Sequence, residues 1–242
     1  EVLPERYLNR NPVLAATESV FDILEPGDTG RVYPLTPPPL TFNNESTTHF
    51  NALAGLTIFR GDALGEAYCG NAFVGESLRN LAHRRVLEPS GPTFIARRGE
   101  LDREFLASTD PWFHPVNFAT GPDGALYVVD FYRRFVEHPD YVHVPEAREK
   151  MPWRTGAEHG RVWRIRDSRE RKSSLTSSFT RARTADLVMQ LEDSNGWRRD
   201  TAQRLLVERR DDTAKRLLES LARNSPRAVG REKPRAARAL DG

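Results

Sequence analysis

The sequence predicts a mainly β-sheet domain followed by a smaller α-helical part. Short apolar runs recur between glycine- and proline-rich turns through the first two thirds of the chain, which is typical of antiparallel strands. Near Thr180 the apolar period changes from that of strands to that of amphipathic helices. We therefore expect a β domain over residues 1–166, a charged linker over 167–182 and helical repeats over 183–242.

The clearest element is a hairpin over residues 116–130. Val116 and Phe118 show the period-2 pattern of a half-buried strand, and the stretch G-P-D-G at 121–124 supplies a tight turn. A second strand, rich in β-branched and aromatic residues, follows and ends at Asp130. Charged and aromatic residues come directly after it. A hairpin that ends in such a loop resembles one repeat of a β-propeller.

Seven other segments have the length and composition of strands: 20–24, 31–35, 56–60, 71–74, 81–87, 93–97 and 160–166. Short strands at this spacing predict a sandwich, a barrel or a propeller. Between the hairpin and the last strand lies a long excursion, residues 131–159, which is rich in prolines and aromatic residues. Because a disordered insertion would be polar, we expect this excursion to be ordered and to pack, with Trp153, across one end of the β domain near Asp130.

The helical part is predicted to contain paired amphipathic helices. Apolar residues recur at helical spacing over 184–191, 197–209 and 211–221, and the stretch 234–242 matches the start of a further helix. Pairs of this length fit HEAT-like repeats, whose period is about 40–47 residues. So few repeats leave their apolar face uncovered, and we therefore expect the chain to be an internal piece of a longer protein.

Composition excludes several classes of site. With 36 basic and 34 acidic residues the net charge is only +2, although residues 168–242 hold 18 Lys/Arg against 11 Asp/Glu. That basic excess suggests a nucleic-acid clamp, whereas the interleaved acidic residues favour a solvated, salt-bridged surface, and we expect no nucleic-acid partner.

Cys69 is the only cysteine, which excludes an intrachain disulfide and a C-x-x-C-H haem site within these residues. No signal-peptide pattern is visible.

Candidate site residues gather around the end of the hairpin. Asp130 is suited to bind a cation or act as a base, and Arg133 presents a planar fork that suits carboxylate oxygens. His114 is suited to abstract a proton from a substrate. The structural alternatives are an ion pair between Asp130 and Arg133 and a strand-capping role for His114. The histidines of the excursion, His138 and His143, match no metal-ligand motif, so no metal site is predicted.

Several segments together resemble one protein family. They are G-L-T-I-F-R-G-D (55–62), Y-C-G-N-A-F-V (68–74), H-R-R-V-L-E-P (83–89), F-L-A-S-T-D-P-W-F-H-P-V-N (105–117), G-P-D-G-A-L-Y-V-V-D-F-Y-R (121–133), G-R-V-W-R-I (160–165) and G-W-R-R-D-T-A-Q-R-L-L-V-E-R (196–209). The family is that of predicted membrane-bound dehydrogenases of the planctomycete and verrucomicrobial lineage. The likeness spans nearly the whole chain. His114 stands where that family usually has arginine.

The resemblance implies a fold and an activity. The fold would be a partial β-propeller like that of quinoprotein glucose dehydrogenase, followed by HEAT repeats and, outside this chain, a c-type haem domain. The activity would be that of a quinone-dependent sugar or alcohol dehydrogenase that passes electrons to this haem. The expected cofactors are pyrroloquinoline quinone and calcium. His114, Asp130 and Arg133 would be catalytic, and Tyr132 with Arg133 would contact the cofactor.

The resemblance also implies a place in the cell. The protein would lie in the periplasm or cell envelope, with any membrane association outside this chain. The partners would be a small sugar or alcohol and the haem domain of the same longer protein. The alternative function is a non-catalytic module of the cell envelope that binds a carbohydrate or a protein.

Overall fold

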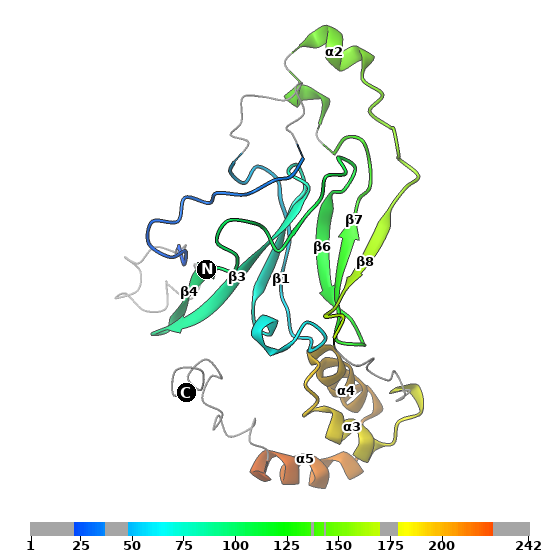
Figure 1. Cartoon of the computed structure of the whole chain (residues 1–242). Coiled ribbons are helices and arrows are strands. Elements are labelled where there is room, and N and C mark those ends of the chain that lie inside the picture. The colour runs from blue at the N-terminus through cyan, green and yellow to red at the C-terminus, as the bar shows by residue number, and fades with distance from the viewer. Residues whose placement is uncertain (1–21, 37–47, 137, 143, 170–178, 225–242) are drawn as a thin grey trace, which may run out of the picture. The chain divides into compact units, whose positions relative to one another are not determined.

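The computed structural model describes residues 22–36, 48–136, 138–142, 144–169 and 179–224 (Figure 1). These residues form two compact units. The sheet unit contains the described residues up to Ile58, together with Gly70–Phe118 and Val128–Trp163. The helix unit contains Phe59–Cys69, Ala119–Tyr127 and the described residues from Arg164 onwards. The chain is mainly β with a few helices, which confirms the predicted fold class at this level.

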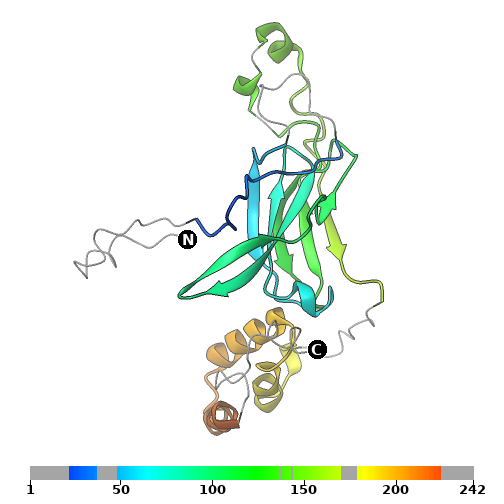
Figure 2. The ribbon, with the colours of Figure 1, turned by 60° about the vertical axis from the view of Figure 1, so that its left-hand side comes forward.

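A five-stranded antiparallel sheet occupies the first half of the described chain. Its strands are β1 (Leu53–Ile58), β2 (Ala72–Glu76), β3 (Leu81–Ser90), β4 (Thr93–Arg98) and the short β5 (Leu106–Ala107). The first four pair in chain order, and β5 pairs with the start of β3. The long strand β3 pairs with different strands along its length. Residues 81–85 pair with β2, and residues 85–90 pair with β4. The β3–β4 hairpin stands out in the turned view (Figure 2).

A second sheet contains three strands, β6 (Pro115–Thr120), β7 (Leu126–Asp130) and β8 (Arg161–Ile165), in that order. β6 and β7 form the predicted hairpin, whose turn is closed by the Gly121 N–H donating to the Ala125 carbonyl oxygen at 2.9 Å. The strands predicted from residue 56 onwards all form, with ends shifted by a few residues.

The strand predicted at residues 31–35 does not form. Arg31 makes only an isolated bridge with His49, and the Tyr33 N–H donates to the Glu104 side chain at 3.0 Å instead of to a neighbouring strand. Pro34 has no N–H to donate, which further weakens pairing here. In the described part of the segment predicted at 20–24, Leu24 forms only an isolated bridge with Ala96.

Glycines allow the two sheets to approach each other closely. A Cβ atom at Gly55 would lie 2.4 Å from the Asn117 Cα atom, and one at Gly75 would lie 2.3 Å from the Pro115 carbonyl oxygen. Both distances are far below van der Waals contact with backbone that cannot move aside. β1 and β2 therefore pack against β6 only because these two positions carry no side chain.

We predict that Gly75→Ala destabilises the protein by about 1–3 kcal/mol, because the added methyl group forces β2 away from β6. The matched control is Gly160→Ala, since nothing lies within 4 Å of a Cβ atom built there. The control is expected to change stability by less than about 0.5 kcal/mol. Urea unfolding of the two variants measures the difference, and equal stabilities would contradict the close sheet contact.

The first described segment is held on the five-stranded sheet by an ion pair between Asp28 and Arg85 of β3. Both side chains are 9% exposed. The hydrogen bond from Arg85 lowers the pKa of the Asp28 carboxyl below its ordinary value of 3.8. Because the ionised carboxylate is favoured in the folded state, the pair contributes stability above the unfolded pKa, and this contribution is lost as the pH falls through the lower folded pKa.

We therefore predict a pH-dependent effect of Asp28→Asn. At pH 7 the variant should be about 1.5–3 kcal/mol less stable than the parent protein, which is typical of losing a hydrogen bond to a charged group. This difference should shrink as the pH falls below 3.8. Chemical denaturation at a series of pH values tests this, and a difference that stays constant down to pH 2 would contradict the assigned role.

The excursion between β7 and β8 carries its own short elements, the 3₁₀ helix η2 (Pro139–Tyr141) and the helix α2 (Pro145–Lys150). Figure 1 shows α2 at its tip, beyond the ends of the strands. Trp153 is half-buried within the excursion, where its ring contacts Phe135 at 5.3 Å and its indole N–H donates to the Arg148 carbonyl oxygen at 2.9 Å. The excursion is thus structured, and its tip is stabilised by contacts of its own.

The helix unit contains α3 (Thr184–Gln190), α4 (Gly196–Arg209) and α5 (Thr213–Asn224), with the 3₁₀ helices η1 (Glu66–Tyr68) and η3 (Phe179–Arg181). α3 packs against both α4 and α5. These helices match the predicted ones, while the stretch 234–242 and most of the charged linker lie outside the described residues.

Asn195 anchors the helices to the turn between β6 and β7. Its side-chain oxygen accepts the Trp197 N–H and caps α4, while its Nδ2 donates to the carbonyl oxygens of Gly121 (3.0 Å) and Pro122 (3.1 Å). A bidentate ion pair between Arg60 and Asp200, at 2.7 and 2.9 Å, adds a second attachment. The helix unit thus joins segments that are far apart in sequence.

Candidate functional site

The Asp130 carboxylate is the centre of the predicted site. Its side chain is fully buried at the end of β7. Oδ1 accepts the backbone N–H groups of His114 (2.9 Å) and Tyr132 (3.0 Å). Oδ2 accepts hydrogen bonds from Arg161 Nε (3.0 Å) and from the Trp163 indole N–H (2.9 Å). A buried carboxylate is stable only with such partners, and these four donors occupy both of its oxygens.

Two of these partners, Arg161 and Trp163, were missed by the sequence interpretation. Both lie on β8 two residues apart, so they share one face of the sheet, and β8 neighbours β7. The alternating stretch R-V-W-R-I could have indicated them, had the pairing of β7 with β8 been known. The ion-pair partner of Asp130 is Arg161, at 2.9 Å, and not Arg133 as the structural alternative assumed.

His114 lies beside Asp130 but turns its ring away from it. The ring is buried, with Nδ1 2.6 Å from the Ser77 carbonyl oxygen and Nε2 3.0 Å from the Arg133 carbonyl oxygen. Each ring nitrogen thus lies near a backbone carbonyl oxygen, and Asn80 Nδ2 lies 3.4 Å from Nδ1, so the ring is enclosed by groups of the protein. The arrangement joins the start of β6 to the loops around it, which corresponds to the strand-capping alternative.

Arg133 approaches this cluster through its backbone, while its guanidinium turns elsewhere. Its NH2 group donates to the Ala157 carbonyl oxygen at 3.1 Å, and its Cζ lies 4.0 Å from the centre of the Phe131 ring. Its Nε is buried and has no hydrogen-bond partner among the described residues. The structure thus brings His114 and Asp130 together, whereas the Arg133 side chain is bound on the returning leg of the excursion.

Next to Asp130, aromatic and basic side chains form a continuous stack. The Arg161 guanidinium lies 3.3 Å from the centre of the Tyr132 ring and 4.8 Å from that of Trp163. The Trp112 ring follows at 5.5 Å from Tyr132, and His159 lies 6.2 Å from Trp112. We call these five residues the aromatic ladder. Cation–π and tilted ring contacts of this kind stabilise such stacks.

The backbone adopts a positive φ at two positions in or next to the aromatic ladder, Tyr132 and Gly156. Tyr132 has a φ of +31°, which is unfavourable for a residue with a side chain, and its N–H is held by Asp130. Gly156 has a φ of +84°, and a Cβ atom there would lie 2.8 Å from the Trp112 ring. Strained backbone that the surroundings enforce is often found at binding sites.

The outer parts of the ladder are open to solvent. Trp163 is 42% exposed, and the His159 side chain is 50% exposed. The Asp110 carboxylate, 38% exposed, lies 3.4 Å from Arg161 and adds acceptors at the same edge. Exposed aromatic faces thus lie beside hydrogen-bonding groups, an arrangement that suits binding better than proton transfer.

The other candidate residues stay apart from this site. His138 contacts Asp140 at 3.3 Å on the surface, while Glu137 and His143 lie outside the described residues. Within the described ranges, no group of three or more His, Cys, Asp or Glu side chains is placed to hold a metal ion. His83 is buried, with its Nδ1 2.6 Å from Glu104 Oε2.

The basic residues of α4 make local contacts. Arg204 pairs with Glu208 at 2.9 Å, and Arg199 donates to the carbonyl oxygens of Asp193 and Ser194. Such contacts are those of a salt-bridged helix surface.

We predict that Asp130→Asn lowers the free energy of unfolding by about 1.5–3 kcal/mol, because an amide nitrogen would face the N–H groups of Arg161 and Trp163 and leave these donors without their acceptor. Asp110→Asn is the matched control, since it removes the exposed partner of the same Arg161 and should cost less than about 1 kcal/mol. Denaturant unfolding compares the two, and near-neutral behaviour of Asp130→Asn would show that Asp130 does not organise the site.

Comparison with known proteins gives a family match. The family model described as "Domain of unknown function (DUF7133)" matches residues 1–169. No curated protein and no solved structure matches the chain. No helix in the described part of the chain is long and apolar enough to cross a membrane.

Proposed function

The chain belongs to the DUF7133 family, and we propose that its sheet unit binds carbohydrate through the aromatic ladder. The observation that carries this proposal is the contrast between two neighbouring groups of side chains. Asp130 and His114 are buried and enclosed by polar groups of the protein, whereas the rings beside them reach solvent. The proposal corresponds to the non-catalytic alternative in the sequence interpretation.

The chemistry of sugars suits such a surface. One face of a pyranose ring carries C–H groups, which pack against an aromatic ring, and its rim carries hydroxyl groups that need hydrogen-bond partners. Trp163 and Trp112 offer the rings. Asp110 and His159 offer acceptors and donors at the edge, with side chains at least one-third exposed. The ladder is already held in place by Asp130, so little ordering is required when a ligand binds.

Calorimetric titration of the protein with a panel of neutral oligosaccharides tests the proposed carbohydrate binding. We predict that Trp163→Ala weakens binding of the best ligand by at least about tenfold, or 1.4 kcal/mol. The matched control is Tyr141→Ala, which removes another aromatic side chain, 57% exposed, on the excursion and outside the ladder. Circular dichroism confirms that both variants are folded. Equal binding by the two variants would contradict the proposal, as would no binding by the parent protein.

The second candidate is the quinone-dependent sugar or alcohol dehydrogenase. It is supported by the resemblance of the quoted segments to that family, and both candidates recognise a sugar. The pairing of β1 to β4 in chain order matches what one four-stranded propeller blade requires, and the α3–α5 packing suits HEAT-like repeats. On this proposal the protein works in the periplasm or cell envelope, beside a c-type haem domain.

The cofactor fit at this site is poor. Both Asp130 oxygens are occupied by N–H donors, so they are not arranged to ligate calcium. The Arg133 Nε has no hydrogen-bond partner in the described structure, but it is buried and therefore not presented to a cofactor. We therefore derive no catalytic step through a quinone at these residues. Dye reduction with added pyrroloquinoline quinone, calcium and sugars distinguishes the candidates, since turnover would favour the dehydrogenase.

A further inference from the structure

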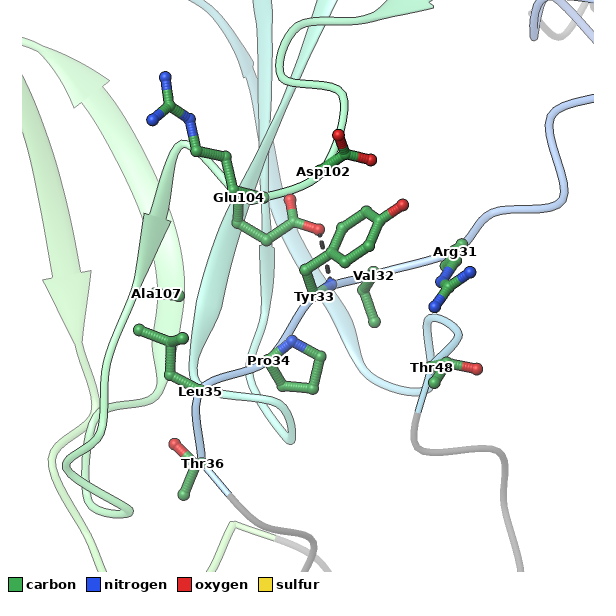
Figure 3. Close-up of a pocket in the computed structure, with 11 residues that line it drawn as sticks. Arg31, Val32, Tyr33, Pro34, Leu35, Thr36, Thr48, Asp102, Glu104 and Ala107 are labelled. Atoms are coloured by element: carbon green, nitrogen blue, oxygen red, sulfur yellow. Dashed lines mark hydrogen bonds between the residues drawn. The ribbon is translucent and has the colours of Figure 1, made fainter.

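Four arginines of β3 and β4 each form an ion pair with a carboxylate. The pairs are Arg84 with Glu100, Arg85 with Asp28, Arg97 with Glu25 and Arg98 with Glu104. Figure 3 shows Glu104 at a cavity of about 680 Å³, where its carboxylate also accepts the Tyr33 N–H at 3.0 Å. Because these four guanidinium charges are neutralised within the sheet unit, they attract an external anion only weakly.

Three other arginines, near the two ends of the excursion, have no carboxylate partner among the described residues. They are Arg133, Arg134 and Arg154, and we call them the basic cluster. Arg133 is partly buried, with its Cζ 4.0 Å from the centre of the Phe131 ring. Arg134 and Arg154 are exposed, and the Arg134 Cζ lies 5.7 Å from the centre of the Phe135 ring. Two guanidinium groups of the basic cluster are thus open to a ligand.

The two legs of the excursion meet at the turn 154–157, which brings the basic cluster together. The Arg154 carbonyl oxygen accepts the Ala157 N–H at 2.9 Å and closes this turn. The Arg134 N–H donates to the Thr155 carbonyl oxygen at 3.2 Å. The Arg133 NH2 group donates to the Ala157 carbonyl oxygen at 3.1 Å. Residues that are about 20 positions apart in sequence therefore place their positive charges around one turn.

The same turn touches the aromatic ladder. A Cβ atom at Gly156 would lie 2.8 Å from the Trp112 ring and 3.3 Å from the Arg133 Cα atom. The Gly156 carbonyl oxygen accepts the His159 N–H at 2.9 Å. Arg133 also follows Tyr132 directly in the chain. A sugar ring stacked on the ladder would therefore have the basic cluster beside it.

Two exposed carboxylates at the ladder limit how much negative charge a ligand can carry. Asp110 lies 3.4 Å from Arg161, which also pairs with Asp130, and Glu158 lies 4.0 Å from His159. The three charges of the basic cluster exceed these two. A ligand with a few separate carboxylates and a rim of hydroxyl groups fits both features, because its hydroxyls can donate to Asp110 and Glu158. A nucleic acid is less suited, since it carries a phosphate at every nucleotide.

We propose that the carbohydrate recognised by the aromatic ladder is acidic, an oligosaccharide of sugar acids. Its ring stacks on the ladder, and its carboxylates pair with the guanidinium groups of Arg134 and Arg154, whose planar forks match carboxylate geometry. This inference rests on the proposed carbohydrate binding and names the class of sugar that binds.

Calorimetric titration with acidic hexasaccharides and their methyl esters tests the role of charge. The probes are hexagalacturonate and hexamannuronate, each beside its fully methyl-esterified form, which keeps the sugar and removes the negative charge. At about 0.1 M salt at least one acid should bind about tenfold or more tighter than its ester, and this advantage should shrink at about 1 M salt because salt screens exposed charges.

The outcomes separate this inference from the proposed function. Esters that bind as tightly as the acids would overturn the acidic preference and leave carbohydrate binding intact. No binding of any oligosaccharide, neutral or acidic, would overturn both. Tighter binding of an oligothymidylate than of either acid would overturn the inference in favour of a nucleic-acid partner.

Variants locate the charge recognition. Arg134→Gln and Arg154→Gln should each weaken binding of the preferred acid by about threefold, and together by about tenfold, with ester binding unchanged. Arg216→Gln, the same change at an exposed position of α5, is the control and should have no effect. Trp163→Ala should weaken acid and ester by the same factor, since both share the stacked ring. Unchanged acid binding in the double variant, or an equal loss for its ester, would overturn the role of these arginines.

Discussion

The structure around the candidate site depends on the burial of one carboxylate. Through its two oxygens Asp130 binds the residue before β6, the second residue after β7 and two side chains of β8. A charge in this position would be costly without each of these donors, so their positions are constrained together. The aromatic ladder follows from this constraint, because the same contacts place Tyr132 and Arg161 against each other.

The same principle recurs where the helices begin. Asn195 is buried and uses its amide fully, with its oxygen on the α4 N-terminus and its nitrogen on the turn between β6 and β7. Glu76, also buried, accepts the backbone N–H groups of Asn51, Ala52 and Leu78 beside β1. Burial raises the pKa of the Glu76 carboxyl, which those N–H donors partly oppose. Polar groups at strand and helix ends thus specify how the segments join, because each must find its partners inside the fold.

This arrangement changes how the charged cluster is interpreted. A histidine, an aspartate and an arginine close to a strand end have the composition of a catalytic site, and the sequence alone supports that hypothesis. In the structure, two of them satisfy buried backbone groups, and the side chains left open beside them are aromatic rings. The proposed function therefore rests on the side chains that are exposed to a ligand. It does not rest on the buried histidine and aspartate, although residues of these types are common in catalytic sites.

The sequence by itself determined the class and order of the elements, because strand and helix periodicity are local properties of the chain. It predicted the β6–β7 hairpin, β8 and the three helices, and it drew attention to Asp130, Tyr132 and His114 through their position after or before a strand. It did not identify Arg161 as the partner of Asp130 or Glu104 as the partner of His83. Those pairs join residues 31 and 21 positions apart, and which strands lie side by side is decided by tertiary packing. Only the fold could show which polar groups are buried and hydrogen-bonded within the protein and which remain exposed to a ligand. Burial depends on contacts between distant segments, and no local sequence pattern encodes these.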